Sequence, residues 1–399
     1  MRIAYVSYEY PPDTAVGGIA TYVYQIANTM HQRGHQVEVF CASAYRTVSE
    51  QIDGIKIHRV LCKNRTIFNE VILPFFELSN NHKKFDIVES PEFSADGLAI
   101  KLKYPDIPLV VKLHTPWFLI GEMNNSYFGF IKKVKFITSG LIRGKLYKPF
   151  WKIRDKQNDP DYLITKLADQ IHTPSISLGD IVSTKWDIQR GQILHVPYSY
   201  IPNNDLLKIP TNTDTNTITY VGRLEVRKGL VELSKAIAIV LKTKPSVKFR
   251  FVGSVQGSPK QNIDMKAYLI STLKKYKKNL EFMEVSSDKI YTIYADTDIC
   301  VFPSIWENFP NTCLEAMSAG RGIVASKNGG MKDMLEDCSG GILINPLKPN
   351  EIANALILLI NQKSLRIEMG TNARKKVLYS YDNGTIGLLM EQKYQALIH

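Results

Sequence analysis

The stretch from residue 299 to residue 330 constrains the fold of this chain more than any other. It begins with Ile-Cys-Val-Phe, an apolar run of residues that favour β-strands, and continues into a polar loop. A short helix is predicted next, because Pro310 suits its first turn and Gly320 suits the left-handed conformation just after its end. A second apolar run at 322–325 completes the pattern, which predicts a β-loop-α-β unit.

Two glutamates of this unit are candidates for binding a ligand. Glu307 lies in the loop and Glu315 in the predicted helix, so both should face the crevice at the carboxyl ends of parallel strands. Free backbone N–H groups at 309–312 and the helix dipole would attract a phosphate or a sugar hydroxyl there. The vicinal hydroxyls of a sugar or a ribose are donors that match carboxylate oxygens. On spacing alone, the alternative that both are ordinary solvated glutamates stays open.

Apolar strands and amphipathic helices alternate along most of the chain. Its 399 residues, 44% of them hydrophobic, are enough for two cores. A polar run rich in Thr and Asn, 203–217, is typical of a linker and divides the chain into domains at 1–200 and 201–378. The alternation predicts an α/β fold of parallel strands with right-handed crossovers. Strands are expected at 2–7, 36–41, 56–60, 86–89, 109–114, 170–173 and 193–196, and after the linker from 218, at 247–253, 280–285 and 299–302.

Both halves carry polar residues where a strand runs into a helix. Gly17 and Gly18 precede the first helix, where paired glycines let backbone approach a phosphate closely. His114 ends a predicted strand and should lie at the carboxyl edge of its sheet. Arg223 and Lys228 follow a strand of the second half, and two cations there suit a leaving diphosphate. Turn glycines, a structural histidine and solvated loop charges are the alternatives.

Several classes of protein are disfavoured. No G-x-G-x-x-G is present, which argues against a nicotinamide or flavin enzyme. Asp296 and Asp298 form a D-x-D, but they precede a strand at its amino end and so mark a strand boundary rather than a metal site. The five cysteines lack metal-ligand spacing and indicate reduced thiols in a cytoplasmic protein. Neither a signal peptide nor a run of ~18 apolar residues is expected.

The net charge of +12 is concentrated in one segment. Nine Lys or Arg residues lie between Lys132 and Lys156 against a single acid, Asp155. Aromatic residues are interleaved, and a basic aromatic segment of this kind at 128–156 can bind anionic lipid headgroups. A solvated helical face or an acceptor-binding loop is the alternative. No helix-turn-helix, RNP or zinc-finger pattern accompanies the charge, so nucleic acid is not an expected partner. The interleaved aromatic residues are Phe128, Phe130, Phe136, Tyr147, Phe150 and Trp151.

Four motifs together resemble one enzyme family. The run Pro-Ser-x-x-Glu307-x-Phe-Pro-Asn-x-x-Leu-Glu315-Ala-Met-x-Ala-Gly is similar to the E-x7-E segment of retaining glycosyltransferases of the GT-B fold, family 4. Gly-Arg223-x4-Lys228-Gly, Leu-His114-Thr-Pro and the glycine pair before the first helix also match that family. The resemblance implies two Rossmann-like domains whose parallel sheets face a central cleft. It also implies that 379–399 forms a C-terminal helix that packs back on the first domain.

The resemblance further implies transfer of a sugar from a nucleotide-diphosphate-sugar to an acceptor hydroxyl, with retention of configuration. No metal or other cofactor is expected. A sugar or lipid-linked acceptor, used in making a cell-surface polysaccharide or glycolipid, and a place on the inner face of the membrane are suggested by the basic segment. Alternatives are a nucleotide-sugar epimerase, a phosphorylase of the same two-domain plan, and a non-catalytic membrane-surface binding protein.

Residue roles follow from the matched motifs. Arg227 is left as a surface residue. The expected catalytic residues are His114, Glu307, Arg223 and Lys228, and the expected donor-binding residues are Gly17, Gly18, Arg223, Lys228, Glu307, Asn308, Phe309, Pro310, Asn311, Thr312 and Glu315.

Overall fold

The computed structural model describes the chain except for residues 15–16, 128–129, 143, 145–154, 261 and 399. The chain forms two compact units, each described by itself below. The first comprises residues 1–174, 178–196 and 387 onward, and the second comprises residues 175–177 and 197–386. The second unit therefore lies almost wholly within one continuous part of the chain, whereas the first includes the last residues of the sequence.

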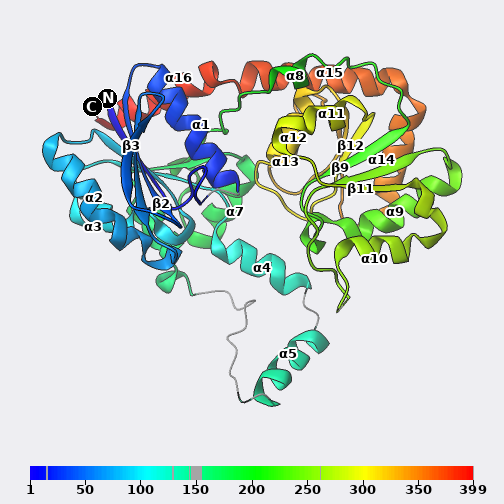
Figure 1. Cartoon of the computed structure of the whole chain (residues 1–399), viewed down its shortest axis with the longest axis horizontal. Coiled ribbons are helices and arrows are strands. Elements are labelled where there is room, and N and C mark those ends of the chain that lie inside the picture. Colours follow the sequence, from blue (N-terminus) through cyan, green and yellow to red (C-terminus); the bar gives the residue numbers. More distant parts are fainter. Residues whose placement is uncertain (15–16, 128–129, 143, 145–154, 261, 399) are drawn as a thin grey trace. The chain divides into compact units, whose positions relative to one another are not determined.

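The first unit is built on a twisted sheet with helices on its faces (Figure 1). Its strands lie in the order β3-β4-β2-β1-β5-β6-β7-β8. Apolar side chains of β1 and β2 form its centre, because every residue of β1 is buried. The bounds are β1 Arg2–Ser7, β2 Gln36–Ser43, β3 Val48–Ile52, β4 Ile55–Leu61, β5 Ile87–Pro91, β6 Leu109–Lys112, β7 Gln170–Thr173 and β8 Ile193–His195.

One edge of this sheet differs from the expected parallel pattern. Every pairing within the described strands of the sheet is parallel except that of β3 with β4, which is antiparallel. The two strands are joined at Asp53 and Gly54, whose φ angles are 50° and 84°. A two-residue Asp-Gly loop with both φ angles positive is the turn that connects antiparallel strands. This hairpin was not predicted from the sequence, although Asp-Gly is its strongest local signal.

Helix α1 follows from its apolar spacing. It buries Ala20, Val23, Ile26 and Met30 against the sheet, and Gly34, with φ of 89°, follows its end. The helices of the first unit are α1 Gly18–Gln32, α2 Phe68–His82, α3 Leu98–Lys103, α4 Trp117–Tyr127, α5 Phe130–Ile142, α6 Pro160–Leu167 and α7 Ile176–Trp186, with short 3-10 turns η1 Arg65–Ile67, η2 Phe93–Ala95, η3 Lys156–Asn158 and η4 Arg190–Gln192.

The second unit has a parallel sheet with strand order β11-β10-β9-β12-β13-β14. Strands β9 and β12 are its buried centre, so Glu307, which follows β12, lies at the middle of the carboxyl edge. Helices α9 and α14 cover one face with Leu233, Ile237, Leu356 and Leu359, which belong to one apolar core. The strand bounds are β9 Thr217–Val221, β10 Lys248–Val252, β11 Leu280–Met283, β12 Ile299–Phe302, β13 Gly322–Ser326 and β14 Ile342–Ile344.

The helices of this unit follow the expected alternation, with additions. A short helix, α8, interrupts the segment expected to be a linker, and the helix expected at 379–399 is present as α16 but begins at Asn383. Helix α15 ends at Ser380 and α16 begins at Asn383. The bounds are α8 Asn204–Leu207, η5 Val226–Lys228, α9 Leu230–Thr243, α10 Met265–Thr272, η6 Lys274–Asn279, η7 Ser287–Lys289, α11 Ile290–Ala295, α12 Asn311–Ser318, α13 Gly330–Leu335, α14 Pro349–Asn361, α15 Lys363–Ser380 and α16 Asn383–Ile398.

The part of α16 that belongs to the first unit is anchored by a buried polar network. The Tyr394 hydroxyl donates to Glu89 Oε2 at 2.5 Å, and the Tyr22 hydroxyl donates to Glu89 Oε1 at 2.7 Å. Burial raises the pKa of Glu89, while the neighbouring Lys112 ammonium and the two hydroxyls lower it. Lys112 is itself fully buried and donates to the Val196 carbonyl. The network therefore links the C-terminal helix to the centre of the sheet through Glu89.

Replacement of Tyr394 by Phe should destabilise the first unit by about 1–3 kcal/mol, because one oxygen of the buried Glu89 carboxyl loses its donor. The measurement is the free energy of unfolding in urea. Tyr379→Phe is the matched control, because Tyr379 is 75% exposed and its loss of a hydroxyl should change stability little. Equal stabilities for the two variants would contradict the anchoring role.

Candidate functional site

Three loops meet at the carboxyl ends of β9, β12 and β13 in the second unit. The loop after β12 is tied to the turn after β9, because the N–H of Ile305 donates to the Arg227 carbonyl at 3.0 Å. It is tied to the turn after β13 on its other side, where Asn328 Nδ2 donates to the Ile305 carbonyl at 2.9 Å. The Glu307 carbonyl oxygen also accepts the backbone N–H of Gly330 at 2.9 Å. Glu307 is thus held by main-chain bonds between two strand–helix turns.

Glycine is required where these turns touch. Gly229 has φ of 75°, and a Cβ there would lie 1.8 Å from the Pro303 carbonyl oxygen. A Cβ on Gly330 would lie 1.7 Å from the Asn308 carbonyl oxygen. No side chain fits at either distance, and the left-handed φ of Gly229 further disfavours one. These two glycines let the Glu307 loop sit directly on the turns that flank it.

The Glu307 carboxylate is the charged centre of this edge. Its Oε1 pairs with Lys228 Nζ and with Arg227 Nη1, the latter at 3.3 Å. Its side chain is only 14% exposed. Burial alone would raise the pKa of Glu307, but the charges of Lys228 and Arg227 outweigh burial, and the pKa lies below its ordinary value. Glu307 is therefore an ionised acceptor whose charge is balanced by two cations.

The expected surface position of Arg227 was wrong, whereas the expected role of Arg223 stays a prediction. Arg227, which the sequence analysis left on the surface, has a side chain only 24% exposed and bonds both Glu307 and Glu225. Arg223 has a side chain 59% exposed and pairs with Glu225 at 3.3 Å. The reason is the 3-10 turn η5, which places Arg227 and Lys228 side by side facing the Glu307 loop. The sequence predicted a loop here, and a loop has no regular spacing from which the direction of the Arg227 side chain could be predicted.

Helix α12 carries the next expected residues. Pro310 caps it rather than occupying its first turn, so the helix begins at Asn311, and the Pro310 carbonyl accepts the N–H groups of Cys313 and Leu314. The first N–H groups of a helix have no partner within it, which leaves those of Asn311 and Thr312 for a ligand. The positive end of the helix dipole lies at the same place.

Asn308 and Phe309 have a packing role in the structure. Asn308 Oδ1 accepts from the Ser175 hydroxyl at 2.7 Å, and Asn308 is 7% exposed. The Phe309 ring lies edge-on to Tyr198 and Tyr381, with ring centroids 5.5 Å and 5.2 Å apart. Their side chains therefore fix the position of the loop, and only their backbone is available for the expected donor contacts.

Glu315 lies in an environment unlike that of Glu307. Its Oε2 accepts from the Tyr294 hydroxyl at 3.0 Å, and no ion pair with it is found among the described residues. Burial raises the pKa of Glu315 to about 7, and the Tyr294 hydrogen bond opposes part of that increase. The two carboxyl groups of the E-x7-E segment therefore differ in charge near neutral pH.

The first unit holds the other expected residues at the carboxyl edge of its own sheet. His114 lies two residues beyond β6, is 5% exposed, and donates its backbone N–H to Glu92 Oε2 at 2.8 Å. Burial lowers the pKa of His114 well below its ordinary value, so its ring is neutral. Gly17 precedes α1 and Gly18 begins it, and a Cβ on Gly17 would lie 3.1 Å from Glu9 Oε2.

The sequence analysis missed a charged cluster beside these residues. Arg65 Nη2 bonds Asp96 Oδ2 at 3.2 Å, and Arg65 Nη1 bonds Glu9 Oε1 at 2.5 Å. The backbone just before Asp96 is strained, since Ser94 and Ala95 have φ angles of 63° and 56°. The signal was available, because Glu-Phe-Ser-Ala-Asp directly follows the expected strand that became β5. A polar run at the end of a buried strand marks the ligand edge of a parallel sheet.

The D-x-D residues have structural partners. Asp298 Oδ2 accepts the backbone N–H groups of Thr215 and Asn216 at 2.9 and 2.8 Å. Asp296 Oδ2 accepts from Arg250 at 2.7 Å. Both aspartates lie at the amino end of β12, as the sequence analysis expected. In the described part of the chain, no three His, Cys, Asp or Glu residues are grouped as metal ligands would be.

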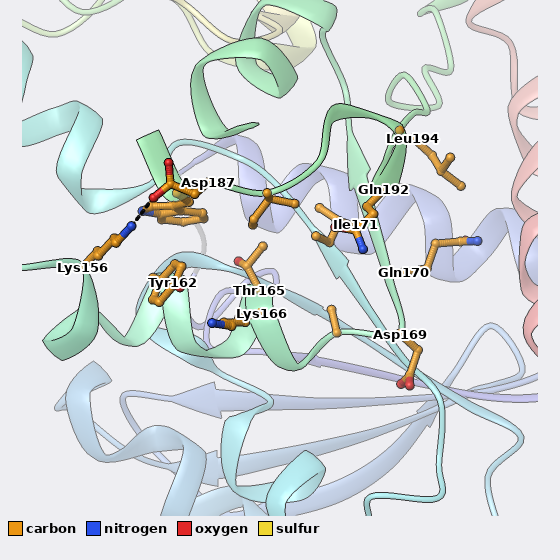
Figure 2. Close-up of a pocket in the computed structure, with 14 residues that line it drawn as sticks. Lys156, Tyr162, Thr165, Lys166, Asp169, Gln170, Ile171, Asp187, Gln192 and Leu194 are labelled. Atoms are coloured by element: carbon orange, nitrogen blue, oxygen red, sulfur yellow. Dashed lines mark hydrogen bonds and ion pairs between the residues drawn. The ribbon is translucent and has the colours of Figure 1, made fainter. Parts of the chain in front are cut away.

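A hollow of about 640 Å³ in the first unit is lined by none of the expected site residues (Figure 2). It is lined by residues at the amino ends of β7 and β8, including Asp169, Gln170 and Gln192. Lys156 and Asp187 form an ion pair beside it. Because ligands of parallel sheets bind at the carboxyl ends of strands, its position does not support a role in the site built by Glu307.

Helix α5 presents an apolar stripe to solvent. Val134, Ile137, Leu141 and Ile142 are 42%, 51%, 60% and 85% exposed, at a spacing that puts them on neighbouring turns. None of the helices in the described part of the chain has the length and hydrophobicity that crossing a bilayer requires. Much of the expected basic segment lies outside the described residues, namely Phe128, Arg143, Lys145, Tyr147, Lys148, Phe150, Trp151, Lys152 and Arg154.

Comparison with known proteins identifies the class of enzyme. Residues 16–198 match the model of Glycosyltransferase Family 4, and residues 204–376 match that of Glycosyl transferases group 1. An uncharacterized glycosyltransferase of Methanocaldococcus jannaschii is 25% identical over 409 residues, which cover 96% of this chain and 95% of that protein. The chain is a glycosyltransferase of the GT-B fold.

Solved structures agree with this fold. Sucrose-phosphate synthase of Thermosynechococcus elongatus superposes with a TM-score of 0.74 at 19% identity, covering 100% of this chain and 99% of that one. Anabaena HepE, solved in complex with UDP, superposes with a TM-score of 0.67 at 16% identity, covering 99% and 100% of the two chains. The glycosyltransferase thus has two Rossmann-like units, as the sequence analysis expected.

Proposed function

We propose that this glycosyltransferase moves a sugar from a nucleotide-diphosphate-sugar to an acceptor hydroxyl, without metal and with retention of configuration. The observation that carries the proposal is the arrangement of Glu307, Lys228 and Arg227 beside the N-terminus of α12. An anion held there would meet two cations and the positive end of a helix. A donor sugar beside that anion would meet the Glu307 carboxylate, which accepts hydroxyl protons.

Relatives support the choice of donor. HepE of Anabaena was solved with UDP-glucose, and starch synthase IV of Arabidopsis thaliana was solved with ADP and acarbose. A Staphylococcus aureus relative, 28% identical over 185 residues that cover 46% of this chain and 47% of that protein, is the capsular polysaccharide biosynthesis glycosyltransferase CapM. From these proteins we propose that the donor is a UDP-, GDP- or ADP-sugar and that the product is a polysaccharide or a glycolipid.

The electrostatics of the second unit favour a mechanism without an enzyme nucleophile. Glu307 is ionised, but its charge is neutralised by Lys228 and Arg227, which makes it a weak nucleophile. The same cations would stabilise the negative charge that grows on the diphosphate as the sugar–oxygen bond breaks. The departing phosphate oxygen then takes the proton of the acceptor hydroxyl as the new bond forms on the same face of the sugar.

Removing a cation should slow transfer. We expect Lys228→Ala and Arg227→Ala to lower kcat by about 100-fold or more, because each loses a charge that stabilises the leaving group. Glu307→Ala should lose most turnover through loss of a sugar contact. The measurement is the rate of sugar transfer with the UDP-, GDP- or ADP-sugar that raises the melting temperature of the protein.

Lys235→Ala is the control for these variants. Lys235 lies on α9, the helix that follows Lys228, and its side chain is 54% exposed. Among the described residues it pairs only with Glu232. Its rate should match that of the unsubstituted enzyme. Rates like that of the control in all three site variants, with folding intact, would overturn the site. Epimerisation of the donor in the absence of acceptor would favour the epimerase alternative, and a trapped covalent glycosyl-enzyme would contradict the mechanism.

Attachment to a membrane surface would bring the enzyme to a lipid-linked acceptor. The support is the exposed stripe of Val134, Ile137, Leu141 and Ile142, flanked on α5 by Lys133 and Lys135. Apolar side chains inserted at the level of the headgroups and lysines near anionic lipid are the two contributions that hold a surface helix on a bilayer. We therefore propose that α5 binds anionic membranes.

The double substitution Leu141→Ser with Ile142→Ser should weaken binding to phosphatidylglycerol vesicles at least about tenfold, because each side chain contributes roughly 1.5–3 kcal/mol when buried. Vesicle co-sedimentation measures it. Leu102→Ser is the control, since Leu102 is 65% exposed on α3 of the same unit and should not affect binding. Unchanged binding in the double variant, or equal binding to neutral phosphatidylcholine, would contradict the proposal.

A further inference from the structure

Glu315 is the one expected donor-binding carboxyl group that has no cation beside it among the described residues. Its neighbours are hydroxyl and thiol groups from three elements. Tyr294 comes from α11, Tyr200 from the segment before α8, and Cys300 from β12. Burial raises the pKa of each of these three groups, so all remain neutral in the range where enzymes work. Glu315 is therefore the member of this cluster that titrates near neutrality, with a pKa of about 7.

The Tyr294 hydroxyl has two acceptors within reach. It lies 3.0 Å from Glu315 Oε2 and 3.1 Å from the carbonyl oxygen of Thr312, which belongs to the first turn of α12. Tyr294 itself is fully buried and belongs to α11. One hydroxyl proton cannot serve both acceptors fully, so the ionised form of Glu315 attracts it and the protonated form releases it to Thr312.

We infer that Tyr294 is a positioning residue for donor recognition, in that its hydroxyl orients the Glu315 carboxyl group toward the ribose hydroxyls. This inference rests on the proposed function, because it assumes that a nucleotide sugar binds at α12. An ionised carboxylate accepts two ribose hydroxyls, whereas a protonated one uses an oxygen as a donor and accepts fewer. The same hydroxyl fixes the first turn of α12, where the free N–H groups of Asn311 and Thr312 await the diphosphate.

The pH dependence follows from the sign of each contribution. The donor should bind better above the pKa of Glu315, where the carboxylate is ionised, and its KM should rise as the pH falls below about 7. The Tyr294 hydrogen bond lowers the pKa of Glu315. Its removal therefore raises that pKa and moves the rise in KM to higher pH.

The test is Tyr294→Phe, assayed for donor KM and kcat from pH 5.5 to 9 at about 0.5-unit intervals. We expect the inflection in KM to move upward by about one pH unit, which raises KM about fivefold near pH 7. We expect kcat at saturating donor to stay within about twofold, since the hydroxyl does not touch the reacting atoms. The probe is the nucleotide sugar, because the terminal phosphate of a free nucleotide has a pKa of about 6 and would mask the effect.

Two further variants separate positioning from folding. Tyr291→Phe changes the same helix at a partly exposed ring and should leave the profile unchanged. Glu315→Gln should abolish the inflection and hold KM at its acidic limit, a result that stands even where Tyr294→Phe lowers the melting temperature. An unchanged profile in Tyr294→Phe, or an inflection that survives in Glu315→Gln, overturns the inference. Absence of nucleotide-sugar binding by the unsubstituted enzyme overturns the proposed function instead.

Discussion

The contact of the Glu307 carboxylate with Lys228 and Arg227 is the interaction on which the rest of the second unit depends. A carboxylate that is 14% exposed is stable in that place only because two cations balance it. The cations are brought there by the η5 turn, and the turn can touch the Glu307 loop only because Gly229 has no side chain. The strand order, the glycines and the charges therefore all contribute to placing Glu307 beside two cations at the carboxyl edge of the sheet.

The two glutamates of α12 and its preceding loop illustrate how environment divides one motif into two functions. Glu307 is surrounded by positive charge and stays ionised, whereas Glu315 is surrounded by neutral hydroxyls and titrates near neutrality. Fixed charges around Glu307 stabilise the charge that develops during the reaction. The orientation of the Glu315 carboxyl group favours its hydrogen bonds with ribose hydroxyls. The proposed donor site thus combines a fixed electrostatic part with a part whose affinity is expected to respond to pH.

Local patterns predicted much of this architecture. The strands, helix α12 and the loop position of Glu307 were readable because periodicity and helix-end residues act within a few positions. The hairpin at Asp53 and Gly54 was also locally encoded but was missed. The side-chain direction of Arg227 and the bond from Tyr294 to Glu315 were not predictable, because each depends on where two segments meet in space. Contacts between segments that lie tens of residues apart do not produce a periodic pattern in a single sequence.

The most direct test of the account is a crystal structure of the full chain with an intact UDP-, GDP- or ADP-sugar, chosen as the one that raises the melting temperature most. The account predicts the diphosphate within hydrogen-bonding distance of Lys228 and the first N–H groups of α12, with the ribose hydroxyls on Glu315. A nucleotide bound elsewhere, such as in the hollow beside Lys156 and Asp187, would contradict it.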